Sequence, residues 1–312
     1  MQRITKILLS LFLVLVLCFS LAGCEGSQLS DLLPQPPSGD APSDLPSPAP
    51  TPTAGELVIH FIDVDQADAI LIMDGDKTVM IDTGNWPDDE HKDYMLDYIK
   101  DLGVTAIDYL ILTHPDADHI GGAPEVINTF EVKNCIMPDC VKTTKVFERT
   151  VTALENRNVN VLLPTPGDSY TLNNAALRIL APLSVTYSDT NDYSVVFRLQ
   201  YGERSILFTG DAEAASEAEM VNRYSAQDLK ADVLKVGHHG SRTSSSDAFL
   251  ALVDPDYAVI SCGVDNSYGH PHSAVINRLN GRGIEIYRTD TDGTIILTTD
   301  GKTLEFSKLG KE

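Results

Sequence analysis

The chain has 312 residues, 43% of them hydrophobic, which is enough to bury the core of one large domain or of two small ones without help from disulfides. Its formal net charge at pH 7 is -22, so its surface field repels polyanions and anionic lipid head groups. This charge argues against sequence-independent binding of long DNA through a basic face. A small anionic substrate can still bind where metal ions supply local positive charge.

The first 23 residues have the pattern of an export signal rather than of a folded element. A basic start, MQRITK, precedes the apolar run LLSLFLVLVLCFS and the sequence LAGC at residues 21–24. LAGC resembles the bacterial lipobox, which implies that residues 1–23 are a lipoprotein signal peptide and that Cys24 is the lipidated first residue of the mature protein. An uncleaved signal anchor is the alternative. Because a multiply acylated terminus anchors stably, we expect a lipid-anchored protein on the extracytoplasmic side of the cell membrane.

Residues 24–54 form a segment rich in proline and serine that has almost nothing to bury. This composition predicts a disordered linker between the membrane and a folded domain at residues 55–312. After residue 23 no apolar run reaches the roughly 18 residues that a membrane span needs. We therefore expect no transmembrane channel in the folded part.

Short β-rich runs dominate the start of the folded part. ELVIHFIDV, DAILIMDG and KTVMIDTG, between residues 56 and 84, predict three strands that pair as antiparallel neighbours. HKDYMLDYIKDLG predicts a helix that ends at Gly103, and IDYLILTH predicts a buried strand at residues 107–114. Further strands are expected in VNVLLP, AALRILAP, SVVFRLQYG, RSILFTGD, ADVLKV and YAVISCG, and helices in AEAASEAEMVNRYS, SSSDAFLALV and HSAVINRLNG.

The C-terminal stretch EIYRTDTDGTIILTTDGKTLEF predicts a hairpin with its turn near Asp292-Gly293. Strands outnumber helices, and antiparallel hairpins are expected at both ends of the domain. We therefore predict an α+β domain in which two mixed sheets pack face to face with helices outside, an αββα layering.

Three cysteines remain beyond the signal and the lipidation position. Outside the membrane Cys135 and Cys140 can form a small disulfide loop, or both can stay free thiols, and Cys262 is left over either way. No pair has the CxxC spacing that is typical of a structural zinc site.

The segment THPDADHIGG, residues 113–122, follows the predicted strand at 107–114 and crowds four candidate ligands together. Imidazoles and carboxylates suit zinc, manganese or iron, and the lack of thiolates argues against a closed structural zinc site. A solvated strand-to-helix turn with capping aspartates is the alternative. The four candidates are His114, Asp116, Asp118 and His119.

Further candidate donors also follow predicted strands or precede them. A single aspartate after a strand is more often a turn residue, but several such positions together favour a shared site. Six of the chain's eight histidines fall into three clusters, and only His60 and His91 stand outside them. The further candidates are Asp192, Ser194, Asp211, His238, His239, His270 and His272.

HPDADH followed by two glycines resembles the HxHxDH signature of the metallo-β-lactamase superfamily, with Asp116 in place of the second histidine. Together with FIDVDQADAILI, MIDTG, NDYSVVF, FTGD, LKVGHHGS and YGHPH, it resembles the hydrolase domain attached to ComEC/Rec2 competence proteins. The resemblance runs from about residue 56 to residue 290. It implies the αββα four-layer sandwich of that superfamily and a site for two divalent metal ions, zinc or manganese.

The resemblance also implies a role for each candidate ligand. His114 and Asp116 would hold the first metal, Asp118 and His119 the second, and Asp211 would bridge both. The His238-His239 pair would supply a further ligand. Many relatives have a histidine at the third motif, where this chain reads TNDYS, so either Asp192 substitutes or the site is weaker. Asp116 makes the ligand set richer in oxygen, which favours manganese over zinc.

The expected activity is hydrolysis of a phosphodiester, with DNA among the candidate substrates, by a hydroxide that two metal ions share and activate. Asp118 would also orient or deprotonate this nucleophile, and Ser194 and His270 would grip a phosphate or assist the leaving group. For His270 a structural, hydrogen-bonded role is the alternative. Hydrolysis of a lactone, amide or thioester is the nearest competing function, and a non-catalytic binding lipoprotein with a degenerate site is the other. No protein partner can be inferred.

Overall fold

The computed structural model describes residues 55–85 and 90–310. The predicted signal peptide at residues 1–23, the linker at 24–54 and the lipidation position Cys24 lie outside the described residues.

The first sheet has eight strands in the order β15-β14-β1-β2-β3-β4-β5-β6. The first three strands in the chain pair antiparallel as predicted, and β3 to β6 then run parallel. The bounds are β1 Leu57–Phe61, β2 Ile70–Asp74, β3 Lys77–Ile81, β4 Ala106–Ile111, β5 Glu131–Ile136, β6 Asn160–Leu162, β14 Thr294–Thr299 and β15 Leu304–Leu309.

The second sheet has seven strands in the order β13-β12-β11-β10-β9-β8-β7. Strands β7 to β10 pair antiparallel, and β10 to β13 run parallel, so the carboxyl ends of β10, β11 and β12 lie at one edge. The bounds are β7 Ser169–Thr171, β8 Ala176–Ala181, β9 Val196–Tyr201, β10 Arg204–Phe208, β11 Val233–Lys235, β12 Tyr257–Ile260 and β13 Glu285–Arg288.

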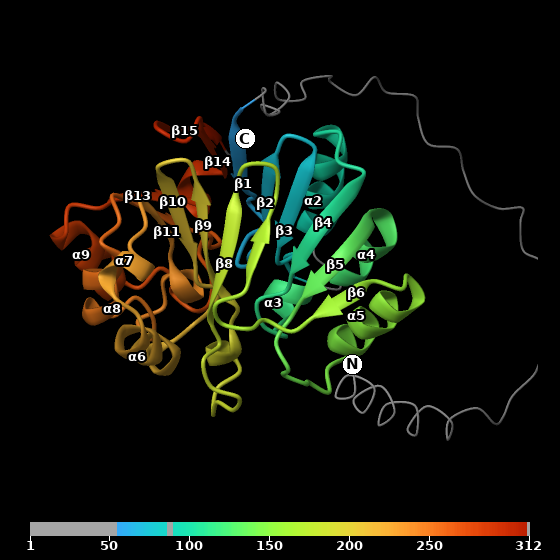
Figure 1. Ribbon diagram of the computed structural model, residues 1–312, viewed down its shortest axis with the longest axis horizontal. Coiled ribbons are helices and arrows are strands. Elements are labelled where there is room, and N and C mark those ends of the chain that lie inside the picture. The colour runs from blue at the N-terminus through green and yellow to red at the C-terminus, as the bar shows by residue number, and fades with distance from the viewer. Residues whose placement is uncertain (1–54, 86–89, 311–312) are drawn as a thin grey trace, which may run out of the picture. The chain divides into compact units, whose positions relative to one another are not determined.

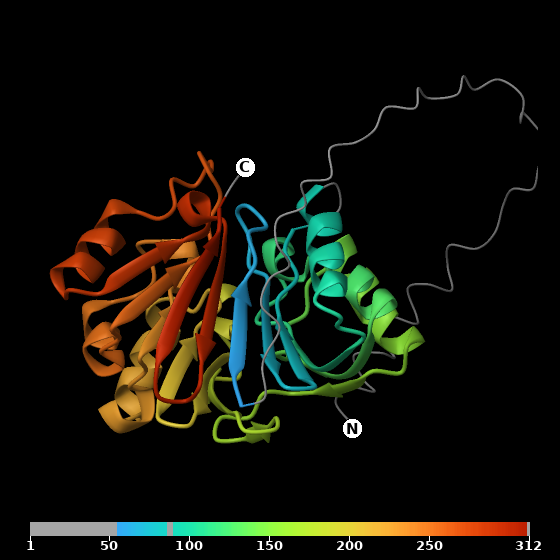
Figure 2. The ribbon, with the colours of Figure 1, turned by 90° about the horizontal axis from the view of Figure 1, so that it is seen from above.

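Helices cover the outer face of each sheet, which confirms the predicted αββα layering (Figure 1). The same four layers are visible from above (Figure 2). On the first sheet lie α2 Glu90–Asp101, α4 Ala123–Thr129 and α5 Lys145–Asn156; on the second lie α6 Ala214–Arg223, α7 Ala226–Leu229, α8 Asp247–Val253 and α9 Ser273–Gly281.

The apolar residues form three layers of core, one between the sheets and one beneath each set of helices. Between the sheets, Phe208 stacks on Phe197 with ring centroids 4.9 Å apart and lies 6.3 Å from the ring of Phe61. Because Phe61 is on β1 and the other two rings are on β9 and β10, this stack joins the two sheets. Both sheet faces are therefore buried, which explains why their strands read as apolar runs rather than as alternating patterns.

The predicted closing hairpin at residues 285–306 is wrong in its turn. Strand β13 pairs with β12 in the second sheet, the short helix α10 Thr289–Asp292 follows, and β14 pairs with β15 in the first sheet. The hairpin turn is Asp300-Gly301, where Gly301 has φ +86° and Asp300 accepts the backbone N–H groups of Lys302 and Thr303. Two Asp-Gly pairs are present, and local sequence does not distinguish which of them closes a hairpin.

The cysteines outside the N-terminal segment, Cys135, Cys140 and Cys262, are all free thiols in the structure. Cys135 is buried beneath the helices of the first sheet, and burial raises the pKa of its thiol. Of the two alternatives for Cys135 and Cys140, the structure therefore shows the free pair.

Candidate metal centre

The loops that follow β4, β10 and β11 meet at one end of the sandwich. Helix α3, Ala117–Ile120, follows β4, and Figure 1 shows it at the lower end of the first sheet. The backbone N–H of Val195 donates to the carbonyl of Thr113 at 2.9 Å, and this bond ties the two sheets together at that end. The amide of His238 likewise donates to the carbonyl of Gly210 at 3.1 Å. Polar side chains from both sheets are thereby brought to one place.

Four side chains at this place offer donor atoms that all lie within 4.8 Å of one another: Asp118, His119, Asp211 and His239. His119 Nε2 is 3.2 Å from one oxygen of Asp211, and His239 Nε2 is 3.7 Å from the other. His239 Nε2 is also 3.4 Å from Asp118 Oδ2. Asp211 therefore lies at the centre of the group, with each of its oxygens facing a different imidazole.

Several of these donor atoms are buried and have no hydrogen-bond partner among the described residues. They are His119 Nε2, His239 Nε2, Asp211 Oδ1 and the nearby His114 Nε2. Leaving buried polar atoms unsatisfied costs about 1–3 kcal/mol each, so three within one group and a fourth beside it are unusual in a native protein. A divalent cation between them would satisfy all of the unpaired atoms that face it. The residues present therefore fit a metal ion bound by nitrogen and oxygen.

The charges of the group also have the pattern of a cation site. Burial by itself raises the pKa of Asp211, but His119 and His239 hold that pKa well below its usual value. Burial by itself lowers the pKa of His119, yet Asp211 and Asp82 raise it well above the ordinary range. The carboxylates around His119 therefore favour positive charge at this place, which is the charge that a bound cation would supply.

His114 lies directly beside this group, with its ring centroid 4.1 Å from that of His119. Burial lowers the pKa of His114 to about 3, so its imidazole is neutral and Nε2 can serve as a ligand. Ser194 is also fully buried, and its hydroxyl accepts the backbone N–H of Asp211 at 3.0 Å. Ser194 thus holds the loop that carries Asp211.

The tandem histidines differ in their surroundings, although both have a left-handed backbone with φ +51°. His239 is buried and belongs to the four-residue group. The side chain of His238 is 22% exposed, and its Nδ1 donates to Glu213 at 2.9 Å. Its Nε2 lies 3.7 Å from Asp211 Oδ2. His239 is therefore the better-placed ligand, and His238 lies at the rim of the site.

Comparison with known proteins agrees with this geometry. A family model described as the metallo-beta-lactamase superfamily matches residues 62–264. The chain belongs to this superfamily. The predicted superfamily resemblance and the predicted fold are both confirmed.

Two curated relatives match about three quarters of the chain. ComE operon protein 3 of Bacillus subtilis is 31% identical over 257 residues, which cover 78% of this chain and 33% of the relative. Recombination protein 2 of Haemophilus influenzae is 32% identical over 239 residues, covering 76% of this chain and 28% of the relative. The chain spans about a third of the length of these relatives. The predicted resemblance to the ComEC/Rec2 proteins is thus confirmed for this domain.

Among solved structures, the metallo-beta-lactamase fold protein YhfI of Bacillus subtilis superposes with a TM-score of 0.53 at 11% identity, covering 78% of this chain and 100% of the other. At this identity the likeness shows the fold alone. Within the part of the chain that the structure describes, no helix is both long enough and apolar enough to cross a membrane.

Besides His114 and His238, the predicted ligands Asp116 and Asp192 also lie outside the four-residue group, and both are bound by other partners. The carboxylate of Asp116 forms an ion pair with Lys142, on the segment before α5. Asp192 is buried, and its Oδ1 accepts the backbone N–H groups of Glu213 and Ser216 at 3.1 and 3.0 Å, where α6 begins. In the structure Asp192 therefore stabilises the start of α6, and its Oδ1 is already engaged there.

Asp82 has no role predicted from the sequence, yet it contacts one of the candidate ligands. It is fully buried after β3, and its Oδ2 accepts from His119 Nδ1 at 2.8 Å. The amide and the hydroxyl of Thr113 also donate to Asp82, at 2.8 and 2.7 Å. Because His119 donates through Nδ1, its Nε2 lone pair is directed into the centre, as in many carboxylate–histidine–metal arrangements. The sequence feature that could have indicated this role is the position of Asp82 directly after an apolar strand, in MIDTG.

His270 lies at the rim of the site, with its ring centroid 5.4 Å from that of His238. Burial lowers the pKa of His270 to about 4, so the ring is neutral. The other histidine of this loop, His272, accepts the backbone N–H of Arg242 at 3.1 Å. His270 is thus the member of the pair that faces the candidate centre.

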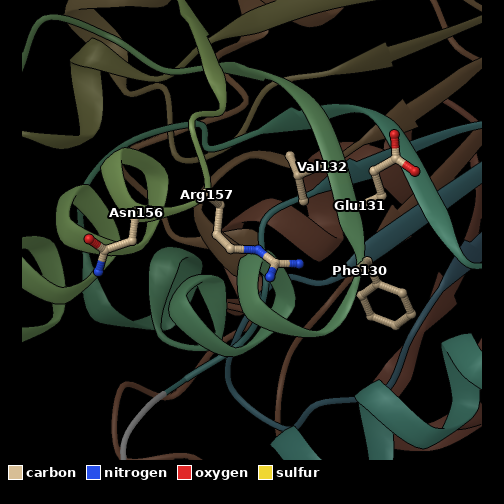
Figure 3. A pocket seen from close by; sticks show the side chains of 5 residues that line it. All are labelled: Phe130, Glu131, Val132, Asn156 and Arg157. Atoms are coloured by element: carbon tan, nitrogen blue, oxygen red, sulfur yellow. The ribbon is translucent and has the colours of Figure 1, made fainter.

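A surface hollow of about 250 Å³ lies away from this centre, lined by Phe130, Glu131, Val132, Asn156 and Arg157 (Figure 3). It is at the start of β5, whereas the candidate centre follows the end of the parallel neighbour β4. The hollow and the centre therefore lie at opposite ends of the strands of this sheet.

Proposed function

We propose that the protein is a metal-dependent hydrolase that cleaves phosphodiester bonds. The observation that carries this proposal is the group of four nitrogen and oxygen donors within 4.8 Å, on a fold whose superfamily is generally hydrolytic. A site that mixes imidazole with carboxylate and leaves one side open is typical of catalytic rather than structural metal sites. Divalent ions bound here would supply Lewis acidity and bring the pKa of water toward neutrality.

The proposal includes two ions, zinc or manganese. The second of the two expected ions would be held by Asp118, His119, Asp211 and His239. The first would be held by His114 and the shared carboxylate of Asp211, with His238 at the rim. Asp116 joins this first position only if its carboxylate leaves Lys142, so the first ion is expected to bind more weakly. The carboxylates of Asp118 and Asp211, together with Asp116 if it joins them, make the ligand set rich in oxygen. Oxygen ligands favour manganese, whereas a set of histidines alone would favour zinc.

The chain's own residues then have distinct tasks in the proposed reaction. The side chain of Asp118 is 30% exposed, so it can hold a water molecule by hydrogen bonding while its Oδ2 faces the centre. His270 is neutral and at the rim, where it can donate a hydrogen bond to a substrate phosphate oxygen. Ser194 and Asp82 contact no substrate and instead hold Asp211 and His119 in place.

A DNA-related substrate is supported by the names of the relatives, which are competence and recombination proteins. The net charge of -22 disfavours long-range attraction of a polyanion, so the bound cations would supply the local positive charge. We therefore propose a short or single-stranded phosphodiester that reaches the centre directly, rather than a long duplex held on a basic surface.

The test is hydrolysis of bis-p-nitrophenyl phosphate by the full-length chain. Removal of metal with EDTA is expected to lower the rate by about 10³-fold or more, because a catalytic ion contributes several kcal/mol to transition-state stabilisation. Manganese or zinc added back in excess is expected to restore it. If lactones or thioesters are hydrolysed in a metal-dependent way and the phosphodiester is not, the substrate assignment is overturned while the metal centre stands.

We further propose that Cys24 is lipidated and anchors the domain outside the cell membrane. Support comes from LAGC at residues 21–24 and from the apolar run before it. Cys24→Ala is expected to abolish incorporation of radiolabelled palmitate, whereas Cys18→Ala, inside the apolar run, is expected to leave it unchanged. Label that persists in the Cys24 variant would refute the anchor.

A further inference from the structure

A charged pair lies completely buried behind the candidate centre. Lys235 and Asp68 have side chains that are 1% and 2% exposed, and the Lys235 ammonium is 2.7 Å from Asp68 Oδ2. Lysine is almost never fully buried, and a buried ion pair is often no more stabilising than two apolar side chains of the same size. Stability alone therefore gives little reason for this pair.

The two residues are placed against the proposed ligands. Lys235 ends β11, four residues before His239 in the sequence. The free oxygen of Asp68, Oδ1, lies 3.5 Å from His239 Nδ1 and has no hydrogen-bond partner among the described residues. The backbone N–H of Asp68 donates to the carbonyl of Asp118 at 3.1 Å. Asp68 thus contacts the ring of one proposed ligand and the backbone of another.

The contact with His239 is electrostatic rather than a hydrogen bond. His239 Nδ1 donates to the carbonyl of Ser261 at 3.0 Å, so the N–H already has an acceptor. Asp68 adds a negative charge on the same side of the ring, which strengthens that orientation and leaves Nε2 directed at the centre. Lys235 Nζ donates to the other carboxylate oxygen at 2.7 Å, and this bond restrains rotation of the Asp68 side chain.

We propose that Lys235 and Asp68 are positioning residues of the metal centre: Lys235 fixes the Asp68 carboxylate, which in turn holds His239 and the Asp118 segment in metal-binding geometry. This inference rests on the proposed metal centre. Its consequence is that metal affinity depends on two residues that contact neither metal nor substrate.

The double variant Asp68→Asn/Lys235→Met tests this directly. It removes both charges together, keeps the approximate side-chain sizes, and so avoids leaving one buried charge alone. Loss of comparable supporting residues costs about 10–100-fold in metal affinity, and we expect the dissociation constants for Mn²⁺ and Zn²⁺ to rise by that factor. The measurement is competition with a chromophoric chelator on the full-length chain. A changed visible spectrum of the Co²⁺ form is expected as well.

The matched control is Asp232→Asn/Arg204→Met. Arg204 and Asp232 form a 3.1 Å ion pair at the other end of the same strands, since Asp232 immediately precedes β11 and Arg204 begins β10. This control is expected to keep metal affinity within about twofold, because pairs with no shared partner usually act independently. Thermal unfolding of both metal-free double variants gives the readout for a purely structural effect.

The outcomes separate this inference from the proposed function. If the double variant at Asp68 and Lys235 binds metal as tightly as the unsubstituted chain, the positioning role is overturned and the metal centre stands. If the unsubstituted chain itself binds no metal, the proposed function fails and this inference with it. Should the double variant not fold, Asp68→Asn alone keeps an acceptor for Lys235, and unchanged metal affinity in that variant would equally overturn the inference.

Discussion

Asp211→Ala is expected to lose the tightly bound metal and to lower kcat/KM for bis-p-nitrophenyl phosphate by about 10³-fold or more. Asp211 is the member of the group that faces both His119 and His239, and one of its oxygens has no other partner. Alanine removes both oxygens at once, so no position remains at which one carboxylate can join two ions. The measurements are metal content by mass spectrometry and steady-state hydrolysis.

The control for this variant is Asp97→Ala. Asp97 is on α2 with a side chain 71% exposed, and it forms a 2.8 Å ion pair with Lys100 one turn away. A surface pair of this kind contributes about 0–1 kcal/mol, so neither metal content nor rate should change. Circular dichroism is expected to be the same for both variants. Full activity in Asp211→Ala would contradict the proposal that Asp211 is a metal ligand required for hydrolysis.

The tandem histidines are expected to respond very differently to the same substitution. His239→Asn should lower metal affinity by at least about 100-fold, because it deletes a buried donor that has no other hydrogen-bond partner on Nε2. His238→Asn should lower it by no more than about tenfold, because His238 is partly exposed at the rim and its Nδ1 is already bound to Glu213. The measurement is the same chelator competition for both variants.

Each histidine variant is the control for the other, since the two residues are adjacent and share the left-handed backbone. Asparagine is chosen because it tolerates that backbone conformation better than most residues. An inverted order, with His238→Asn the more damaging change, would assign the primary ligand to His238 and contradict the geometry.

Local sequence predicted the layering and the main cluster for a physical reason. Residues after parallel strands gather at one edge, so Asp211 after β10 and His239 after β11 could be expected near each other once the strands were recognised. HPDADH follows β4 of the first sheet, so it meets Asp211 and His239 only if the two sheets face each other. The resemblance to the superfamily predicted that the sheets do so.

Contacts that join distant segments could not be predicted in the same way. Asp82 supports His119 because β3 and β4 are parallel neighbours, but the two residues are 37 positions apart in the sequence. Lys235 meets Asp68 across a separation of 167 residues. Neither partner identifies the other in the sequence, because a lysine in the apolar run ADVLKV reads as an exposed strand end.

Local sequence also indicated candidate ligands whose carboxylates have other partners in the structure. Asp192 was a candidate ligand from the sequence, yet its carboxylate accepts two backbone N–H groups at the start of α6. Asp116 stands at a ligand position of the motif, and Lys142 reaches it from a segment with no recognisable pattern. In both cases the competing partner lies more than twenty residues away in the sequence.

Anomalous diffraction at the manganese and zinc absorption edges, from crystals of the metal-loaded protein, decides directly whether these side chains hold a cation. We expect a strong peak between the imidazoles of His119 and His239 and the carboxylates of Asp118 and Asp211, and a weaker one near His114. A metal-loaded crystal with no anomalous peak among those four side chains would contradict the assignment on which the hydrolytic function depends.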